Sequence, residues 1–483
     1  MSPTPTTRTF FGHPFQLGKL FQIELWERFS FYGMQAILMM YLYYQTTSGG
    51  LNIDKTVAGG IVGAYGGSIY LATILGGWLS DRLIGAERTL FWSGVVVMSG
   101  HIALALLPDF VGLVAGLVLI AFGSGGVKAS ASSMVGQLYE SRETRHLRDA
   151  GFSIFYIAIN IGALLGPLLT GLLQSNIGFH YGFGAAAVGM AFGLWQYSRG
   201  RKFLPKTPAP FPLQSHEKPT LFRFTLLGLV VFALAIALGW LHFGNFKSVL
   251  LAVVILLSVY YFTRLLTGKH STATQKKYIQ AYLPLFLTSC IFWALWFQFY
   301  TVITIYIDET AKAQRMLGSF EIPVAWFSAL QGFWVIIFSG LLASLWMKMG
   351  KQQPKTPDKF AYGLIIVGVF YLLYMPFLGD SVMPLIIIAL SIIVLTLAEL
   401  LISPISLSFA TKITPPHFKT QMVALNFLSL SIGFTLGGLI FEWFYHADKL
   451  LHFYGLLGAI GIGCGVLLLV FTNNLNRMLS GID

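Results

Sequence analysis

Apolar stretches long enough to cross a lipid bilayer recur along almost the whole chain. The segment 364–377, LIIVGVFYLLYMPF, is one example and contains no charged residue. A helix needs about 20 mainly apolar residues to cross a bilayer core, whereas a transmembrane β-strand alternates apolar and polar residues over about ten positions. Backbone polar groups inside lipid must also be hydrogen-bonded within the chain itself. The pattern therefore predicts an all-α membrane protein.

Few charged residues are available to cover a surface exposed to water. Only 10% of the 483 residues are charged and 55% are hydrophobic, whereas soluble domains are about 25% charged. A net charge of +12 would suggest a nucleic-acid partner for a soluble protein, but here Lys and Arg in cytoplasmic loops explain it. We therefore expect the lipid bilayer as a partner and no nucleic acid.

The sequence contains no pattern that indicates a cofactor or a catalytic centre. Cys290 and Cys464 lie in apolar segments far apart in the sequence and are expected to be free thiols. No H-E-x-x-H motif occurs, and no serine–histidine or paired-aspartate arrangement falls at membrane depth. We expect no cofactor, no metal ion and no catalytic residues, so the chain is not expected to be an enzyme.

Polar breaks divide the sequence into fourteen candidate transmembrane helices. The first is expected at 20–46 and the ninth at 277–307. When the N-terminus is placed inside, few of the 31 Lys and Arg lie in segments on the outer side; these are Lys55, Lys247, Lys312, Arg315 and Lys449. Cytoplasmic loops carry an excess of Lys and Arg, so both termini are expected in the cytoplasm.

A linker rich in proline and charge separates the first six predicted helices from the remaining eight. Two six-helix bundles are the usual plan of the major facilitator fold, which is built from repeats around a central site. The two extra helices are then predicted to be an inserted hairpin. The expected divisions are an N-terminal tail (1–19), an N-terminal six-helix bundle (20–199), a cytoplasmic linker (200–220), an inserted transmembrane hairpin (221–270), a C-terminal six-helix bundle (271–473) and a C-terminal tail (474–483).

Five ionisable residues fall inside three of the predicted helices. They are Glu24, Glu27, Arg28, Lys128 and Glu399. A lone charge in the middle of a bilayer costs about 2.5–3.5 kcal/mol on insertion scales. Such residues can form ion pairs that only lock helices together, or they can line a cavity that water and substrate reach. Their number and their spread over three helices favour a shared, water-accessible functional cavity.

The spacing of the first three charges places them on one side of the first helix. Glu24 and Glu27 are three residues apart, and Glu24 and Arg28 are four apart, so their side chains are neighbours on a helix. Tyr32 continues the same face by one more turn. A nearby cation stabilises an ionised carboxylate, whereas burial stabilises the neutral form. We therefore interpret this face as a group that takes up and releases a proton.

A run of glycines precedes Lys128, in the sequence AFGSGGVK at 121–128. The phosphate-loop motif GxxxxGK[ST] is absent, and the run lies in an apolar helix and not after a strand. Small residues allow membrane helices to approach closely, so we interpret the glycines as packing positions. Lys128 is then a fixed cation, suited to an anionic group or to a carboxylate on another helix.

Four short motifs resemble those of the proton-coupled oligopeptide transporters, the POT or PTR family, bacterial type. ELWERFSFYG at 24–33 resembles E-x-x-E-R-F-x-Y-Y-G, and FSIFYIAINIG at 152–162 is similar to F-x-x-x-Y-x-x-x-N-x-G. GGVK at 125–128 and ELLISP at 399–404 resemble the lysine motif of helix 4 and the E-x-x-x-S-P motif of the tenth bundle helix. The matches run through most of the chain.

This resemblance implies a proton-coupled symporter that imports di- and tripeptides by alternating access. It further implies a multi-pass protein of the bacterial inner membrane, driven by the proton gradient and expected to act as a monomer. Another small substrate, such as nitrate, a modified amino acid or a peptide-like compound, remains an alternative for the same fold.

The resemblance also implies roles for individual residues. Lys128 would face the carboxylate of the peptide and Glu399 its amine, while Glu24, Glu27, Arg28 and Lys128 would form the proton-linked switch. The expected substrate-binding residues are Tyr32, Tyr70, Lys128, Tyr156, Asn160, Glu399, Ser403, Gln331 and Trp293.

Several positions depart from the family pattern. Phe31 replaces the first tyrosine of the Y-Y pair, and Gln331 with Gly332 replaces an Asn-Pro on helix 8. Gln35 and Phe297 stand where the pattern has an arginine and an acidic residue that pair across the outer gate. Because losing one member of a buried ion pair would leave its partner unpaired, the joint loss predicts an outer gate closed by apolar and hydrogen-bonded packing, with no proton-coupling carboxylate from helix 7.

Overall fold

Long helices make up nearly all of the regular structure in the computed structural model of the protein, which describes residues 9–205, 208–242, 244–268, 272–379, 381–413 and 419–480. Fourteen helices in these ranges have 17 or more residues. Twelve are long and apolar enough to cross a membrane. The other two are α1 (Phe15–Tyr43), which carries three charges near its middle, and the glycine-rich α6 (Phe179–Gly200). The prediction of an all-α membrane protein is confirmed.

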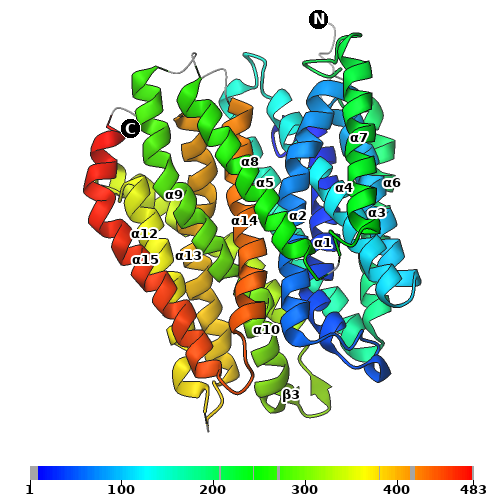
Figure 1. Cartoon of the computed structure of the whole chain (residues 1–483), viewed down its shortest axis with the longest axis vertical. Helices are drawn as coiled ribbons and strands as arrows, with labels where there is room; N and C mark the ends of the chain where they lie inside the picture. Colours follow the sequence, from blue (N-terminus) through cyan, green and yellow to red (C-terminus); the bar gives the residue numbers. More distant parts are fainter. Residues whose placement is uncertain are drawn as a thin grey trace, which may run out of the picture. The chain divides into compact units, whose positions relative to one another are not determined.

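The chain forms two compact units. Unit 1 comprises residues 1–37 and 72–246. Besides most of α1 and all of α6, it contains the helices α3 (Ala86–Leu106), α4 (Asp109–Gln137), α5 (Arg148–Asn176) and α7 (Glu217–Ala237) and the π-helical segment η2 (Ser80–Ile84). Helix α3 packs against both α4 and α6 (Figure 1). The apolar core of unit 1 includes Leu20, Val97, Val127, Met134 and Phe155.

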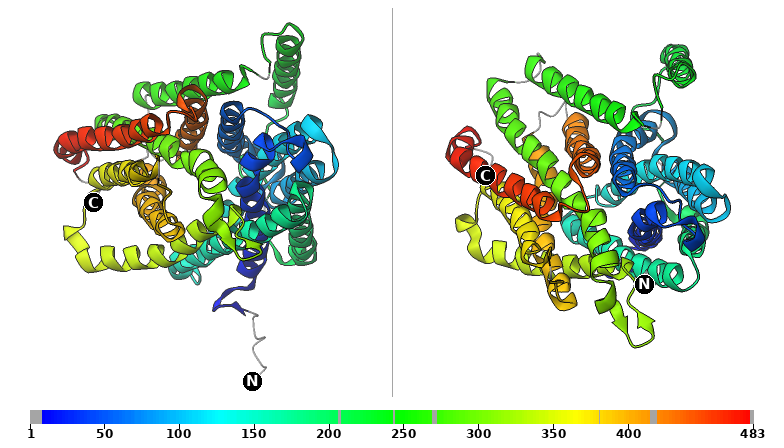
Figure 2. Two further views of the ribbon diagram at one scale, coloured as in Figure 1. Left: turned by 90° about the horizontal axis from the view of Figure 1, so that it is seen from below. Right: turned by 60° about the horizontal axis from the view of Figure 1, so that its bottom comes forward.

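Unit 2 comprises residues 38–71 and 247–483. Its helices are α8 (Phe246–Thr267), α9 (Ala273–Phe297), α10 (Val302–Ile305), α11 (Ala325–Met349), α12 (Thr356–Leu372), α13 (Leu385–Lys412), α14 (Lys419–Phe444) and α15 (Leu450–Met478). Helix α12 lies between α13 and α15, as the views in Figure 2 also show, and α9 packs against α14.

Helices α1 and α2 (Lys55–Leu79) each belong to both units. The C-terminal end of α1, the connecting loop and most of α2, together residues 38–71, pack within unit 2. In this part, the Ser431 hydroxyl of α14 donates a hydrogen bond to the Gly67 carbonyl of α2 at 2.7 Å. A Cβ at Gly63 would lie 2.6 Å from Gly438 Cα. The contact between α2 and α14 therefore depends on small residues.

The helix expected at 277–307 is interrupted in the structure. Helix α9 ends at Phe297, and a short 3-10 turn, η5 (Gln298–Tyr300), follows it. Thr301 has φ −118° and ψ −92°, outside the helical region, before α10 begins. The Gln298 side chain accepts a hydrogen bond from the Thr301 hydroxyl at 2.8 Å and donates one to the Gly437 carbonyl at 2.7 Å. These contacts supply partners where the helical ladder is broken.

Helices α7 and α8 occupy the range expected for the inserted hairpin. The described side chains of α7 are largely exposed, whereas α8 buries one face, which includes Phe262 against Tyr282 and Phe286 of α9. Lys247, which we expected on the outer side at the start of a helix, lies in α8 and is buried. Its Nζ is 2.7 Å from Glu442 Oε1 of α14. This ion pair gives the ammonium the partner that a buried charge requires.

Candidate substrate and proton-coupling site

The three charges predicted to share a face of α1 form one buried ion cluster in unit 1. Arg28 Nε lies 2.8 Å from Glu24 Oε1 and 3.0 Å from Glu27 Oε2. The side chains of Glu24, Glu27 and Arg28 are 2%, 0% and 5% exposed. One guanidinium therefore serves two carboxylates, and Glu24 Oε2 has no hydrogen-bond partner among the described residues. The cluster carries one net negative charge when both carboxylates are ionised.

A hydroxyl from α4 completes this cluster. Ser124 Oγ donates a hydrogen bond to Glu27 Oε1 at 2.9 Å, and Ser124 is fully buried. Ser124 belongs to the glycine-rich run one turn before Lys128. Added Cβ atoms at Gly125 and Gly126 would lie within 2.4 Å of Ala72 and 2.0 Å of the Ser93 hydroxyl, so the run allows close helix packing, as predicted. The sequence interpretation missed Ser124, because a serine in an apolar helix gives no signal of its partner.

Lys128 lies close to the same cluster in unit 1. It interacts electrostatically with Glu24, Glu27 and Arg28, and its Nζ is 5.0 Å from the centre of the Phe31 ring. Arg28 Cζ is 5.9 Å from the same ring. Phe31 therefore loses the hydroxyl of the usual tyrosine but presents an aromatic face to two cations, an arrangement that favours cation–π attraction.

Close packing against α5 holds α1 in place. A Cβ at Gly162 would lie 2.5 Å from the Leu25 carbonyl oxygen, and one at Gly166 would lie 2.3 Å from that of Phe29. The two glycines, four residues apart, lie on the same side of α5 and allow the helix backbones to touch. The position of the ion cluster on α1 is thus fixed by the spacing of glycines on another helix.

The other predicted residues of unit 1 lie on α1 and α5. Tyr32 packs edge-on against Phe31 at 5.1 Å and interacts electrostatically with Arg28. Asn160 is buried and donates a hydrogen bond to the Tyr156 carbonyl, one turn back in α5, at 2.8 Å. The Tyr156 side chain is 41% exposed. Unit 1 therefore brings Tyr32 to the ion cluster.

Unit 2 brings together Glu399 and Gln331. Gln331 Nε2 of α11 donates a hydrogen bond to Glu399 Oε2 of α13 at 2.6 Å. Gln331 is 9% exposed, whereas Glu399 is partly exposed. No ion pair to Glu399 occurs among the described residues, and the hydrogen bond to this carboxylate comes from the neutral amide of Gln331.

Aromatic residues predicted to bind substrate also meet in unit 2. The rings of Trp293 and Phe434 stack with their centroids 5.9 Å apart, and the Tyr70 ring lies 5.3 Å from the same Phe434 ring. Trp293 is 4% exposed and its indole nitrogen has no hydrogen-bond partner among the described residues. Ser403, four residues beyond Glu399 on α13, is partly exposed.

Phe297 is enclosed by apolar groups. It is fully buried and its ring packs edge-on against that of Phe434, with the centroids 5.3 Å apart. It also packs close to Gly437, where an added Cβ would lie 3.0 Å from the Phe297 ring. Together with the hydrogen bonds of Gln298, this packing agrees with the apolar, hydrogen-bonded arrangement expected at this level of the helix. No group of His, Cys, Asp and Glu suited to a metal ion occurs in the part of the chain that the structure describes.

Comparison with known proteins identifies the family. The family model described as the POT family matches residues 87–457. The chain belongs to the POT family. This POT chain is 36% identical to the di-/tripeptide transporter of Lactococcus lactis subsp. cremoris, over 99% of each chain. It is 39% identical to the uncharacterized transporter YclF of Bacillus subtilis (strain 168), over 98% of this chain and 96% of that one.

Solved structures of the POT family share the fold. A mutant of peptide transporter POT in complex with alafosfalin matches with a TM-score of 0.93 and 36% identity, over 98% of each chain. The predicted major facilitator architecture and the resemblance drawn from the four motifs are therefore confirmed. The family is one of transporters and not of enzymes.

Proposed function

We propose that this POT chain is a proton-coupled symporter that imports di- and tripeptides by alternating access. The relatives named as di-/tripeptide transporters support the cargo. The observation that carries the proposal is the buried ion cluster of Glu24, Glu27 and Arg28, with Lys128 beside it, in a chain of this family. Such ionisable groups inside a membrane protein mark ion or substrate pathways and proton relays.

A zwitterionic peptide needs a cation for its carboxylate and an anion for its amine. We assign Lys128 to the peptide carboxylate and Glu399 to the peptide amine. Gln331 orients Glu399 through its 2.6 Å hydrogen bond without neutralising it. The remaining proposed substrate-binding residues are Tyr32, Tyr70, Tyr156, Asn160, Ser403 and Trp293. Each end of the peptide would thus exchange water for an opposite charge.

The ion cluster on α1 would act as the proton-linked switch. Arg28 cannot give up its proton in a protein, so the carboxylates Glu24 and Glu27 are the groups that change charge. Protonating one of them cancels the net negative charge of the cluster and weakens its hold on Arg28 and Lys128. A proton and a peptide bound together would favour closure, and their release inside would permit return. A charge moving inward gains about 2.3 kcal/mol per 100 mV.

The orientation follows from the distribution of cations. We place both termini in the cytoplasm of a bacterial inner membrane and expect the transporter to act as a monomer. The loop between α1 and α2 and the segment after α9 then lie on the outer side.

Uptake into proteoliposomes tests this function. Purified protein is reconstituted, a pH gradient is imposed, and accumulation of labelled dialanine is measured with and without a protonophore. We expect accumulation that requires the gradient, and competition by di- and tripeptides but not by tetrapeptides. Competition by nitrate or by a modified amino acid, with none by dipeptides, would instead favour another cargo on the same fold.

A further inference from the structure

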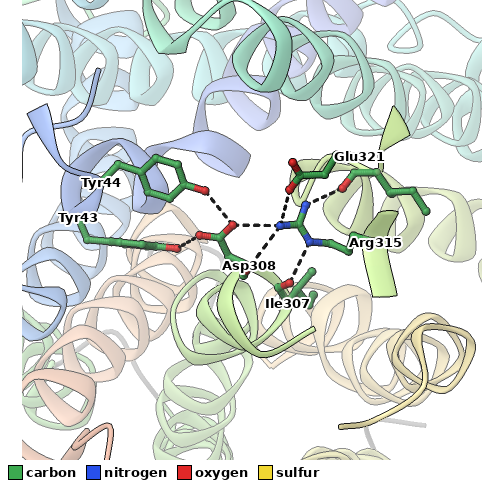
Figure 3. A network of polar contacts seen from close by, with 7 residues as sticks. Tyr43, Tyr44, Ile307, Asp308, Arg315 and Glu321 are labelled. Carbon is green, nitrogen blue, oxygen red and sulfur yellow. Dashed lines mark hydrogen bonds and ion pairs between the residues drawn. The ribbon is translucent and has the colours of Figure 1, made fainter. Parts of the chain in front are cut away.

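A carboxylate near the end of the interrupted helix binds two tyrosines at the end of α1. Asp308 lies in the π-helical segment η6 (Tyr306–Thr310) and is 4% exposed. Tyr43 Oη donates a hydrogen bond to Asp308 Oδ2 at 2.5 Å, and Tyr44 Oη donates one to Asp308 Oδ1 at 2.8 Å (Figure 3). All three residues belong to unit 2. Each oxygen of the carboxylate thus receives one phenol from α1 or its first following residue.

Arg315, seven residues after Asp308, forms an ion pair with this carboxylate. Arg315 Nη2 lies 3.3 Å from Asp308 Oδ1 and 2.9 Å from Glu321 Oε1. Its other nitrogens donate to the carbonyls of Ile307 at 3.0 Å and Ile322 at 2.7 Å. Arg315, which we expected in an outer segment between helices, lies in such a connection and is only 2% exposed. Figure 3 shows the guanidinium between the two carboxylates, opposite the tyrosines.

Further hydrogen bonds fix this segment to the rest of unit 2. Tyr306 Oη donates to the Phe377 carbonyl at 3.2 Å and accepts from the Met383 amide at 3.0 Å. The hairpin of β3 (Met316–Leu317) and β4 (Phe320–Glu321) carries Glu321 back to Arg315. Asp308 is therefore part of a network of hydrogen bonds and ion pairs that η6, the 3-10 turn η7 (Lys312–Arg315) and this hairpin build together.

Backbone hydrogen bonds in the loop after α1 help to position the two donors, Tyr43 and Tyr44. The amides of Asn52 and Ile53 bond back to the carbonyls of Tyr44 and Leu42 at 2.8 Å each. A Cβ at Gly50 would lie 2.3 Å from the Tyr44 carbonyl oxygen, so this close return of the chain requires glycine. Tyr43, the last residue of α1, and Tyr44, the residue after it, are thus held next to a compact loop.

The network lies farther along both helices than the positions where the family pattern has its gate charges. Asp308 follows Phe297 by eleven residues, beyond the break at Thr301, and Tyr43 follows Gln35 by eight residues, about two turns of α1. Phe297 itself is enclosed by Phe434 and Gly437. The chain therefore lacks the charges at the usual level and has a polar closure nearer the outer end of the same two helices.

We propose that Asp308, held by Arg315, closes the outer gate of the transporter by accepting hydrogen bonds from Tyr43 and Tyr44. This gate residue stands in for the acidic residue that Phe297 replaces. The proposal rests on the proposed function and orientation, because a gate acts only in a transport cycle. It assigns a positioning role: Asp308 holds the α1 end and does not contact the peptide.

The distribution of charge explains how such a gate can open. Asp308 and Arg315 lie seven residues apart on one segment, so they stay paired when α1 moves away. Within this buried network only two neutral hydroxyls leave, and water can replace their partners. The neighbouring Lys55–Glu309 pair is exposed, so separating it costs little. A buried ion pair divided between the two sides would instead leave two separated charges, which is costly. Hydrogen bonds to a charged acceptor are nevertheless about twice as strong as neutral ones, so the closed state is favoured.

Distance measurements between spin labels test the gate without any substrate. Labels are placed at Thr47→Cys, in the α1–α2 loop, and Ser319→Cys, in the β3–β4 hairpin; both positions are exposed. Cys290 and Cys464 are replaced by alanine, and the full chain is measured in lipid nanodiscs. We expect one short distance in the parent and a longer component in Tyr43→Phe/Tyr44→Phe. The open-to-closed ratio should rise at least about tenfold.

Two further variants keep this test decisive. The single variant Tyr44→Phe, which retains the ring, should give a smaller rise in the same direction. Glu309→Gln breaks the neighbouring exposed ion pair to Lys55 at 2.6 Å and should leave the distances unchanged, because exposed pairs contribute little. Unchanged distances in the double tyrosine variant would overturn the gate proposal, whereas a failure of peptide uptake would count against the proposed function alone.

Discussion

Ser124 of α4 donates a hydrogen bond of 2.9 Å to Glu27 of α1, and both side chains are fully buried. This contact joins the glycine-rich run before Lys128 to the ion cluster of Glu24 and Arg28. A change in the charge of Glu27 therefore alters a hydrogen bond to α4, the helix that carries Lys128, which we propose to bind the peptide carboxylate. Proton and peptide binding would therefore be linked through side chains of one unit.

Removing that hydroxyl should weaken the coupling. In Ser124→Ala, Glu27 Oε1 loses its donor inside the protein, and hydrogen bonds to charged groups are worth about 1.5–3 kcal/mol. We expect proton-driven dialanine uptake to fall about tenfold or more, while exchange of dialanine at equal pH falls less. Ser130→Ala is the matched control, because Ser130 is also buried on α4 but its hydroxyl has no partner among the described residues. A similar loss in both variants would contradict the role of Ser124.

The assignment of the two peptide ends predicts a change in preference, not only in rate. The parent should prefer dialanine over N-acetyl-dialanine, which lacks the amine, and over dialanine amide, which lacks the carboxylate. Glu399→Gln should remove the first preference and leave the second, and Lys128→Gln should do the reverse. Competition against a labelled dipeptide in proteoliposomes gives both ratios. If Glu399→Gln still discriminated against the acetylated peptide as the parent does, the assignment would be wrong.

Helix packing next to the ion cluster should be sensitive to a single methyl group. In Gly162→Ala the new Cβ would lie 2.5 Å from the Leu25 carbonyl oxygen, and overpacking typically costs about 1–3 kcal/mol. We expect a clear fall in the unfolding temperature in detergent. Gly184→Ala on α6 has no atom within 4 Å of the new Cβ and should leave the unfolding temperature unchanged or raise it slightly. Equal temperatures for the two variants would show that α1 and α5 do not touch as described.

The ion pair between α8 and α14 should stabilise the attachment of the hairpin. Lys247→Met leaves the Glu442 carboxylate without its cation. Breaking a buried pair costs about 3–5 kcal/mol, and because Glu442 is 22% exposed we expect a smaller loss of about 1–3 kcal/mol. The double variant Lys247→Met/Glu442→Gln should recover most of the unfolding temperature. A double variant no better than the single one would indicate that the Lys247 side chain contributes packing and not charge.

Local spacing in the sequence was enough to predict the ion cluster on α1. Residues three and four apart on a helix are neighbours whatever the tertiary fold, so the spacing of Glu24, Glu27 and Arg28 alone places them together. The glycines before Lys128 could likewise be interpreted as packing positions, because few other roles suit small residues in an apolar helix.

Contacts between distant segments could not be predicted in this way. Ser124 meets Glu27 across 97 residues, and Tyr44 meets Asp308 across 264 residues, so neither partner has a local signal. Lys247 was expected on the outer side at the start of a helix, and nothing in its local sequence indicates that Glu442, 195 residues away, is its partner. The break at Thr301 also depends on a tertiary contact, the hydrogen bond of Gln298 to α14.

The buried carboxylates of α1 are proposed to tie peptide movement to proton movement, and the accumulation of dialanine by Glu27→Gln in proteoliposomes measures this coupling directly. The parent should concentrate dialanine above its external level when a pH gradient is imposed, whereas Glu27→Gln should exchange dialanine across the membrane but bring it only to equal concentrations. If Glu27→Gln concentrated dialanine as far as the parent under the same gradient, proton coupling through the α1 carboxylates would be contradicted.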